Sequence, residues 1–305
     1  MRGVFVDAND SLAEIFERQR RNGDPDVRVR QDPNIKPEQW PAILGGAEIG
    51  VVDHTALPTA IATQCTGLKH VVFLGTGARS YMNPDELAEL GISVHLIKGY
   101  GDTAVAESAI ALMWASARVL AQMDREMRAG NWLREDAMQL TSKTLGLIGF
   151  GGIAAEVARI AKGAGMRVIA WNRSPKQHPG VEFVPLDRLL ADSHVISIHL
   201  LLNDETRGFI TREKIAAMRP GVILVNTARG AIVDEAAMID ALKSGHIRHA
   251  GLDVFNIEPL PKDHPLTKLP NVTLSAHSAF RTPEASENLI QAAWEHCRRV
   301  ARGGG

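Results

Sequence analysis

Short apolar runs alternate with helical patterns along almost the whole chain. In the first third, candidate strands lie at Gly3–Val6, Ile49–Val52, His70–Leu74 and Ser93–Ile97, with helical patterns between them. Strands that are joined by helices pair in parallel, and the resulting sheet carries helices on both of its faces. The pattern therefore predicts an α/β fold built on parallel sheets.

A second series of the same kind begins at Thr144–Ile148. It continues with a helix over Ile153–Lys162 and strands over Arg167–Trp171, Val195–Leu200, Val222–Asn226, His249–Leu252 and Val272–Ser275. Single hydrophobic cores stop growing near ~250–300 residues, so a chain of this length has room for two domains. We predict two doubly wound parallel-sheet domains, a flavodoxin-like one of residues 1–99 plus 281–305 and another of residues 100–280. Ligands bind at the carboxyl ends of strands in such sheets, so the cleft between the domains is the expected active site.

Charge and cysteine content exclude several classes of partner. The formal net charge of −1, without a long basic run, argues against nucleic acid or an anionic membrane as the main partner. Cys65 and Cys297 are far apart and match no metal or redox spacing, so we expect free thiols, no metal site and a cytoplasmic location. The apolar run Thr103–Met123 carries Glu107 and Arg118, which indicates a buried helix rather than a membrane span.

A glycine-rich segment, Gly149-Phe150-Gly151-Gly152-Ile153-Ala154, lies between a predicted strand and a predicted helix. Gly149 permits a tight turn, and Gly151 lets the backbone approach a pyrophosphate. The helix N-terminus would supply amide donors and partial positive charge to the phosphates. The context favours a dinucleotide site in a Rossmann domain over a plain turn, with Gly149, Gly151, Gly152 and Ile153 as cofactor-binding residues.

The end of the next predicted strand indicates which dinucleotide binds. An NAD site usually places an acidic residue about 20 positions after the first glycine, where it binds the ribose 2′-hydroxyl. Here the segment reads Asn172-Arg173-Ser174, which has no carboxylate and contains a cation. This favours NADP, with the three side chains near the 2′-phosphate. The alternative is that Arg173 is a solvated surface charge and that the protein accepts both NADP and NAD.

Three later stretches each place an ionisable residue just after a predicted strand. Arg229 has a planar guanidinium that suits a bidentate carboxylate. His277 lies among small residues, and Glu258 could hydrogen-bond its imidazole and favour the protonated form. These groups can hold a 2-keto acid and move a proton to its oxygen, although each alone could be a surface charge or a structural histidine.

Together these residues closely resemble the motifs of the D-isomer-specific 2-hydroxyacid dehydrogenases, which include glyoxylate/hydroxypyruvate reductases and phosphoglycerate dehydrogenases. The likeness extends from about Gly99 to Ala292, and the first 70 residues match only in general pattern. Its most specific stretches are Leu147–Ala154, Leu190–Ser197, Met218–Gly230 and Ala250–Pro259.

The resemblance implies a role for each residue. Arg229 would bind the substrate carboxylate and keto oxygen, Glu258 would pair with His277, and His277 would be the general acid in reduction and the base in oxidation. Asp253 would hold the nicotinamide carboxamide, and Thr227 would line the cofactor site.

Two further segments gain a role from the same resemblance. The loop Leu74-Gly75-Thr76-Gly77 resembles one whose backbone amides grip the substrate carboxylate, with an ordinary turn as the alternative. The helix that starts at Thr103 matches the family's dimer helix, so we expect a homodimer.

The sequence also departs from the family pattern. Leu201 and Ala279 stand where a proline and a glycine are usual, and Phe73 and Leu74 stand where phosphoglycerate-specific members carry an arginine. We expect an NADPH-preferring reductase of small 2-keto acids, most favourably glyoxylate or hydroxypyruvate. The alternatives are a dinucleotide-sensing binding protein resembling transcriptional corepressors, and a phosphoglycerate dehydrogenase-type enzyme.

Overall fold

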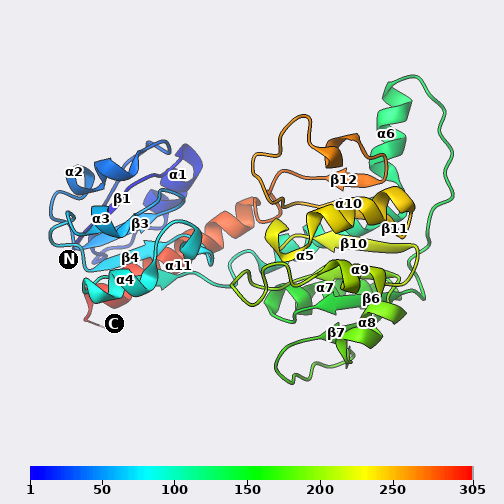
Figure 1. Cartoon of the computed structure of the whole chain (residues 1–305). Helices are drawn as coiled ribbons and strands as arrows, with labels where there is room; N and C mark the ends of the chain where they lie inside the picture. Colours follow the sequence, from blue (N-terminus) through cyan, green and yellow to red (C-terminus); the bar gives the residue numbers. More distant parts are fainter. Residues whose placement is uncertain (304–305) are drawn as a thin grey trace. The chain divides into compact units, whose positions relative to one another are not determined.

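The computed structural model describes residues 1–303, which fold into two compact units (Figure 1). Unit 1 comprises Met1–Gly101 and the segment from Arg281 onward, and unit 2 comprises Asp102–Phe280. Each unit contains one sheet, and every pair of neighbouring strands in both sheets is parallel. The predicted α/β class with two parallel sheets is confirmed.

Unit 1 has a five-stranded sheet in the order β2-β1-β3-β4-β5, which is the flavodoxin-like order. Its strands are β1 (Arg2–Phe5), β2 (Asp26–Val29), β3 (Ile49–Val52), β4 (His70–Phe73) and β5 (Ser93–Leu96). Its helices are α1 (Asp10–Arg18), α2 (Trp40–Leu44), α3 (Thr59–Ala62), α4 (Pro84–Glu89) and α11 (Pro283–Ala301), with short 3₁₀ segments at Pro37–Gln39 and Ala78–Ser80. Strand β2 was not predicted, because it is a charged edge strand in which only Val27 is buried.

Unit 2 has a seven-stranded sheet in the order β12-β11-β10-β9-β6-β7-β8. Its strands are β6 (Thr144–Ile148), β7 (Arg167–Trp171), β8 (Glu182–Phe183), β9 (Val195–Ile198), β10 (Val222–Asn226), β11 (Ile247–Leu252) and β12 (Val272–Leu274). Its helices are α5 (Asp102–Ala117), α6 (Leu120–Arg128), α7 (Gly152–Gly163), α8 (Leu186–Asp192), α9 (Arg212–Ala216) and α10 (Glu235–Ser244), with 3₁₀ segments at Gly230–Ile232 and Pro265–Lys268.

Strand β10 shows why the central strands could be predicted from the sequence. Val222 and Leu224 pack into the core on one face of the sheet, whereas Ile223 and Val225 pack into a separate core on the other face. A strand that is buried on both faces must be apolar at every position, so it appears in the sequence as a continuous hydrophobic run. The central strands of unit 2 were therefore predicted with small errors at their ends.

The single helix predicted over Thr103–Met123 is wrong. Helix α5 ends at Ala117 and α6 begins at Leu120, with a bend of 63° between them. Val119 adopts a left-handed conformation with φ 56°, which interrupts the helical hydrogen bonding although its side chain is buried. Neither glycine nor proline marks this break, so the sequence carried no signal for it.

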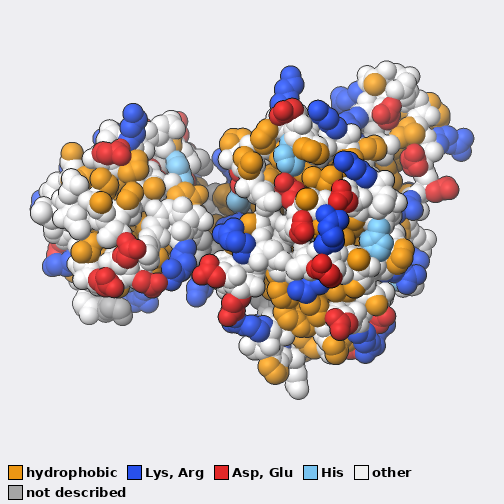
Figure 2. Space-filling model, in the orientation of Figure 1, with side chains coloured by type: hydrophobic (Ala, Val, Ile, Leu, Met, Phe, Trp, Pro, Cys, Tyr) orange, Lys and Arg blue, Asp and Glu red, His pale blue; other side chains and the backbone are white. Residues whose placement is uncertain are grey.

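The helices were compared with what a membrane span requires, and the surface shows charges of both signs. No single helix among residues 1–303 has the length and apolar character that a membrane crossing needs, and α5 and α6 meet that criterion only jointly, as a bent pair. Figure 2 shows Lys and Arg side chains interspersed with Asp and Glu over the face in view.

The C-terminal helix α11 belongs to the core of unit 1. Trp294 is fully buried, stacks on Phe16 with ring centroids 4.2 Å apart, and donates its indole N–H to the Phe16 carbonyl at 2.9 Å. Nearby, Arg298 binds both oxygens of Asp24 at 2.7 and 2.9 Å and lowers the pKa of that carboxyl. Cys297 is a buried free thiol whose pKa is raised by burial to about 12.

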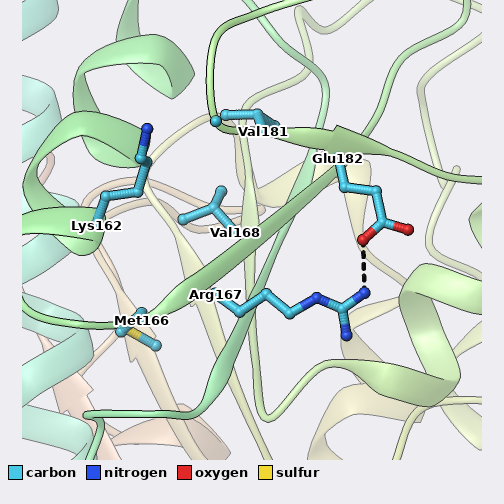
Figure 3. A pocket seen from close by; sticks show the side chains of 7 residues that line it. Lys162, Met166, Arg167, Val168, Val181 and Glu182 are labelled. Atoms are coloured by element: carbon cyan, nitrogen blue, oxygen red, sulfur yellow. Dashed lines mark hydrogen bonds and ion pairs between the residues drawn. The ribbon is translucent and has the colours of Figure 1, made fainter.

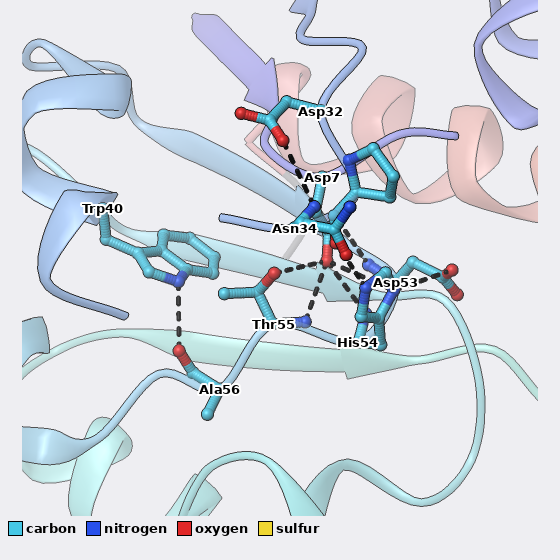
Figure 4. Close-up of polar contacts among 9 residues, drawn as sticks. Asp7, Asp32, Asn34, Trp40, Asp53, His54, Thr55 and Ala56 are labelled. Atoms are coloured by element: carbon cyan, nitrogen blue, oxygen red, sulfur yellow. Dashed lines mark hydrogen bonds and ion pairs between the residues drawn. The ribbon is translucent and has the colours of Figure 1, made fainter. Parts of the chain in front are cut away.

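The carboxyl ends of β1 and β3 carry a set of internal polar contacts, which we call the Asp7 cluster (Figure 4). The fully buried Asp7 carboxylate accepts the N–H groups of Asp53, His54 and Thr55 and the Thr55 hydroxyl, all at 2.8–2.9 Å. His54 Nδ1 lies 3.2 Å from the Asp53 carboxylate, and Nε2 lies 2.6 Å from the Pro33 carbonyl. Both partners are acceptors, so both ring nitrogens donate, and the contact with Asp53 raises the pKa of His54 to about 9.

Candidate active site

The three ionisable residues singled out from the sequence leave adjacent strand ends in unit 2. Strand β11 lies between β10 and β12, and the register aligns Asn226 with Leu252 and Leu252 with Leu274. Arg229, Glu258 and His277 lie in the segments that follow these three strands. Parallel pairing thus brings residues that are up to 48 positions apart (277 − 229) to one edge of one sheet.

His277 and Glu258 form a direct pair. Nδ1 of the imidazole lies 2.6 Å from Oε2 of the carboxylate, and about a third of each side chain is exposed. The second carboxylate oxygen accepts the backbone N–H of Phe255 at 2.9 Å, which fixes the orientation of the carboxylate. Because a carboxylate accepts hydrogen bonds, Nδ1 carries a proton, and Nε2 is the ring atom that can exchange a proton with a ligand.

Asp253 holds the backbone of the histidine loop. Its side chain is 1% exposed and accepts the N–H groups of Ser278 and Ala279, each at 3.0 Å. Its carbonyl accepts the N–H of His277 at 2.8 Å. His277 has φ 48°, a conformation that is strained for a residue with a side chain, and these three hydrogen bonds stabilise it. This anchoring was not foreseen from the sequence, which suggested a contact of Asp253 with the nicotinamide.

Arg229 retains donors for a ligand. Its half-buried guanidinium donates to the Ala228 carbonyl at 2.6 Å, and within residues 1–303 no carboxylate lies in ion-pair range of it. Asn226 braces the turn, because its side chain donates to the Arg229 carbonyl and accepts the Ala228 N–H, both at 2.9 Å. Sequence reasoning missed Asn226, although its position at the end of an apolar strand was a usable signal.

Gly230 joins the segments that carry Arg229 and Glu258. A Cβ atom at Gly230 would lie 2.1 Å from the carbonyl carbon of Phe255 and 2.5 Å from the amide nitrogen of Asn256. Such distances are possible only for a residue without a side chain. The glycine therefore lets the two loops pack backbone to backbone, a requirement that appears only in the folded chain.

The glycine-rich turn has the geometry of a phosphate site. Gly149 has φ 87°, and a Cβ there would lie 2.7 Å from the carbonyl oxygen of His199. A Cβ at Gly151 would meet nothing within 4 Å, so the backbone there is open to a ligand. Gly151 is also the N-cap of α7 and provides no side-chain cap, which leaves the first helical amides for an anion. These features fit a dinucleotide pyrophosphate.

The segment after β7 folds against this turn. Asn172 accepts the N–H of Phe150 at 3.1 Å and donates to the Ser174 carbonyl at 2.9 Å, and Lys176 donates to the Phe150 carbonyl. Arg173 is paired with Glu205, and both side chains are about 70% exposed. Exposed ion pairs are worth only ~0–1 kcal/mol, so an arriving phosphate could displace Glu205. Sequence reasoning missed Lys176, a second cation beside the turn.

In unit 1, the Gly75 loop follows β4. Leu74 is buried, and the N–H of Gly75 donates to the Phe73 carbonyl at 2.8 Å, so this amide is already occupied. Within residues 1–303, the amides of Thr76 and Gly77 have no internal acceptor in hydrogen-bonding geometry. Only these two amides of the loop are therefore free to bind a carboxylate.

A hollow at the outer edge of unit 2 is separate from these groups (Figure 3). It is lined by Lys162, Met166, Arg167, Val168, Gly180, Val181 and Glu182. Arg167 begins β7, so the hollow lies at the amino end of that strand, away from the strand ends that carry Arg229 and His277. Among the described residues, no group of three or more His, Cys, Asp and Glu side chains is placed to hold a metal ion.

Comparison with known proteins agrees with this geometry. The family model of the D-isomer specific 2-hydroxyacid dehydrogenase NAD binding domain matches residues 110–279, more than half of the chain. A glyoxylate reductase from Aeropyrum pernix is 41% identical, over 99% of this chain and 92% of the relative, and a hydroxypyruvate reductase from Thermotoga maritima is 40% identical, over 84% and 85%. A solved acyclic imino acid reductase in complex with NADPH and D-Arg is 29% identical with a TM-score of 0.87, over 100% of this chain and 98% of that one. The chain belongs to the D-isomer specific 2-hydroxyacid dehydrogenase family and is an NAD(P)-dependent D-2-hydroxyacid dehydrogenase.

Proposed function

We propose that the protein is an NADPH-preferring reductase of small 2-keto acids, with glyoxylate and hydroxypyruvate as the favoured substrates. The observation that carries the proposal is the His277–Glu258 pair at 2.6 Å, which joins the segments after β12 and β11, while Arg229 follows β10, the other neighbour of β11. Relatives about 40% identical to the chain are named glyoxylate reductase and hydroxypyruvate reductase. In this proposal unit 2 binds the cofactor. In unit 1, the unpaired amides of Thr76 and Gly77 are candidate donors for a carboxylate.

The side chains divide the reaction between them. A reduced nicotinamide bound through α7 would supply the hydride that C2 of the keto acid receives. Arg229 binds the substrate carboxylate and the keto oxygen through paired N–H donors, and it stabilises the negative charge that develops on that oxygen. His277 Nε2 gives its proton to the same oxygen, so the carbonyl becomes a hydroxyl and the imidazolium becomes neutral imidazole. Glu258 keeps the proton on Nδ1 and stabilises the imidazolium before transfer.

The substrate is tested with a panel of 2-keto acids and both cofactors. We expect NADPH absorbance to fall when glyoxylate or hydroxypyruvate is added, and kcat/KM to decrease as the substrate side chain grows. Phosphohydroxypyruvate as the best substrate would support the phosphoglycerate-type alternative. Tight dinucleotide binding without turnover of any 2-keto acid would point to a binding protein and contradict the proposal.

The cofactor preference is tested separately. Without a carboxylate at Asn172, nothing there repels a 2′-phosphate, and Arg173 can add a charged hydrogen bond of ~1.5–3 kcal/mol. Preference for NADPH should therefore be roughly 10- to 150-fold in kcat/KM. Arg173→Ala should remove most of it, Asn172→Asp should shift the preference towards NADH, and Glu205→Gln should increase it by releasing Arg173. A wild-type enzyme that prefers NADH would contradict this part of the proposal.

We also propose that the protein is a homodimer in the cytoplasm. Helix α6 projects from unit 2 (Figure 1), and this region exposes three large apolar side chains: Leu120 and Met127, each 51% exposed, and Trp132, 77% exposed. Burying such a surface against a second copy would remove it from water. Sedimentation at micromolar concentration should give about twice the 33.1 kDa of one chain. A mass of one chain would contradict the dimer.

A further inference from the structure

A carboxylate lies against the first turn of the phosphate-binding helix. A Cβ atom built on Gly152 would be 1.8 Å from Oδ2 of Asp102 and 2.9 Å from its carboxyl carbon, so the carboxylate occupies the space of a side chain at position 152. Gly151, in contrast, has nothing within 4 Å. The absence of a side chain at Gly152 therefore leaves room for the Asp102 carboxylate in this position, whereas the space beside Gly151 is open to a ligand.

Asp102 is the first residue of α5, and α5 packs extensively on α7. Within residues 1–303, no donor or cation lies in hydrogen-bonding or ion-pair geometry with its carboxylate. Burial raises the pKa of this carboxyl and is the sole cause of the shift. The carboxylate is thus a partly buried anion without a partner, next to the helix terminus whose free amides fit a pyrophosphate.

Charged groups on the surrounding elements do not compensate it. On α5 itself the next charged residue is Glu107, and β10 and β12, which pack on α5, bring none. Three other elements packed against α5, namely α7, β11 and α6, carry charged or titratable side chains. These are Glu156, Arg159 and Lys162 on α7, Arg248 and His249 on β11, and Asp124, Arg125, Glu126 and Arg128 on α6. None of them shifts the pKa of Asp102.

We propose that Asp102 is the electrostatic neighbour of the cofactor pyrophosphate and that dinucleotide binding is coupled to uptake of a proton by Asp102. The inference rests on the cofactor site proposed at α7. A pyrophosphate bound to the first amides of α7 and an ionised Asp102 place like charges at one helical turn, and like charges disfavour the ionised form of a carboxyl group. The dinucleotide therefore binds more tightly to the protonated protein, and its affinity decreases as the pH rises.

The experiment is calorimetric titration of NADH into wild-type protein, Asp102→Asn and Glu107→Gln at pH 5.5, 7.0 and 8.5. NADH is the probe because it has no 2′-phosphate, whose own titration near pH 6 would obscure the effect. Repeating each titration in buffers of different ionisation enthalpy counts the protons that are taken up. Wild-type protein should lose about tenfold in affinity between pH 5.5 and 8.5 and take up a fraction of a proton.

Asp102→Asn keeps the shape of the side chain and removes its charge. It should bind NADH about tenfold more tightly than wild type at pH 8.5, with a flatter pH dependence and less proton uptake. Glu107→Gln is the matched control, because it makes the same change of charge at an exposed position of the same helix. It should behave like wild type.

The outcomes separate this inference from the proposed function. Suppose that wild-type protein binds NADH. If Asp102→Asn then binds NADH no more tightly than wild type, or if Glu107→Gln tightens NADH binding as much as Asp102→Asn does, the inference about Asp102 is overturned, whereas the proposed cofactor site is retained. If wild-type protein binds neither NADH nor NADPH, the cofactor site itself fails. Asp102→Ala, with thermal unfolding as a check of folding, distinguishes loss of charge from an effect specific to asparagine.

Discussion

Each unit holds a buried carboxylate shortly after a parallel strand, where it accepts backbone N–H groups from the loop of a neighbouring strand. In unit 1, Asp7 follows β1 and accepts the backbone N–H groups of residues 53–55. In unit 2, Asp253 follows β11 and accepts those of Ser278 and Ala279. In both cases an acceptor at the end of a parallel strand holds the loop that follows a neighbouring strand. The hydrogen bonds that anchor the loop therefore do not distinguish the strand ends at Asp7 and Asp253.

The histidine that belongs to each loop does distinguish them. Both ring nitrogens of His54 have acceptors, in the Asp53 carboxylate and the Pro33 carbonyl. For His277, Glu258 is bound to Nδ1, and within residues 1–303 no protein group is hydrogen-bonded to Nε2. A polar atom that is already paired contributes to stability, whereas an unpaired one can bind a ligand or transfer a proton. Chemistry at these sheet edges thus depends on which polar atoms the fold leaves unpaired.

The largest expected effect is on stability and comes from Asp7→Ala. Removing this acceptor leaves the N–H groups of residues 53–55 and the Thr55 hydroxyl without their partner, at ~1–3 kcal/mol for each group that stays unsatisfied, less where water reaches the partly buried N–H groups of Asp53 and His54. The free energy of unfolding should fall by about 3–5 kcal/mol in urea titrations. A loss below about 1 kcal/mol would mean that the Asp7 cluster does not stabilise unit 1 as its hydrogen bonds indicate.

His277→Ala tests whether the histidine with an unpaired ring nitrogen is the proton donor. General acid–base catalysis typically contributes ~10²–10⁴-fold, so kcat should fall at least about a hundredfold while the Kd for NADPH is unchanged. The matched variant His54→Ala should leave kcat near that of wild type, because both nitrogens of His54 are used within the protein. Retention of more than about a tenth of kcat by His277→Ala would remove this residue from the proposed mechanism.

Arg229→Lys tests whether a positively charged donor is enough to bind the substrate carboxylate or whether the planar guanidinium is required. Lysine keeps the charge and loses the planar pair of donors, so kcat/KM should fall at least about tenfold, in line with ~1.5–3 kcal/mol for a hydrogen bond to a charged group. Steady-state kinetics with glyoxylate measures the change. Near-normal kinetics would mean that a group other than Arg229 binds the substrate carboxylate.

The smallest effect is an acid sensitivity of unit 1. His95 lies 3.2 Å from His70 and close to His296 and Arg299, and burial followed by these neighbours lowers the pKa of His95 to about 4. Below pH 6.5 the unfolded chain takes up a proton that folded His95 does not, so stability is full above pH 6.5 and is lost as the pH falls towards 4. This histidine should account for about 1 kcal/mol of the stability lost between pH 7.5 and 5.5.

His95→Gln provides the control for this effect. The variant should lose less stability than wild type over the same pH interval, as measured by urea titrations at the two pH values. Equal losses would show that the acid sensitivity arises elsewhere, for example from His199 or His249, whose pKa values burial also lowers to about 4.

The accuracy of the sequence predictions follows the burial of the elements. Strands such as β6 and β10 were located correctly because burial on both faces makes them continuously apolar. Strand β2 at the edge of its sheet lacks that pattern, and the left-handed Val119 that separates α5 from α6 has no local signature. The roles of Asn226, Gly230 and Asp102 could not be predicted from the sequence, because each depends on a contact that forms only in the folded chain. For Gly230 and Asp102, the contacting segment is also distant in the sequence.

By itself, the sequence determined the α/β class, the family and the types of side chain available at the strand ends. These properties are local, since they follow from hydrophobic periodicity and short motifs. Tertiary structure decided which polar atoms are paired. It joined Arg173 to Glu205, gave Nε2 of His54 an acceptor in the Pro33 carbonyl, and placed Asp102 against Gly152. Pairing depends on distances of a few ångströms between segments far apart in the chain, and only the folded backbone sets those distances.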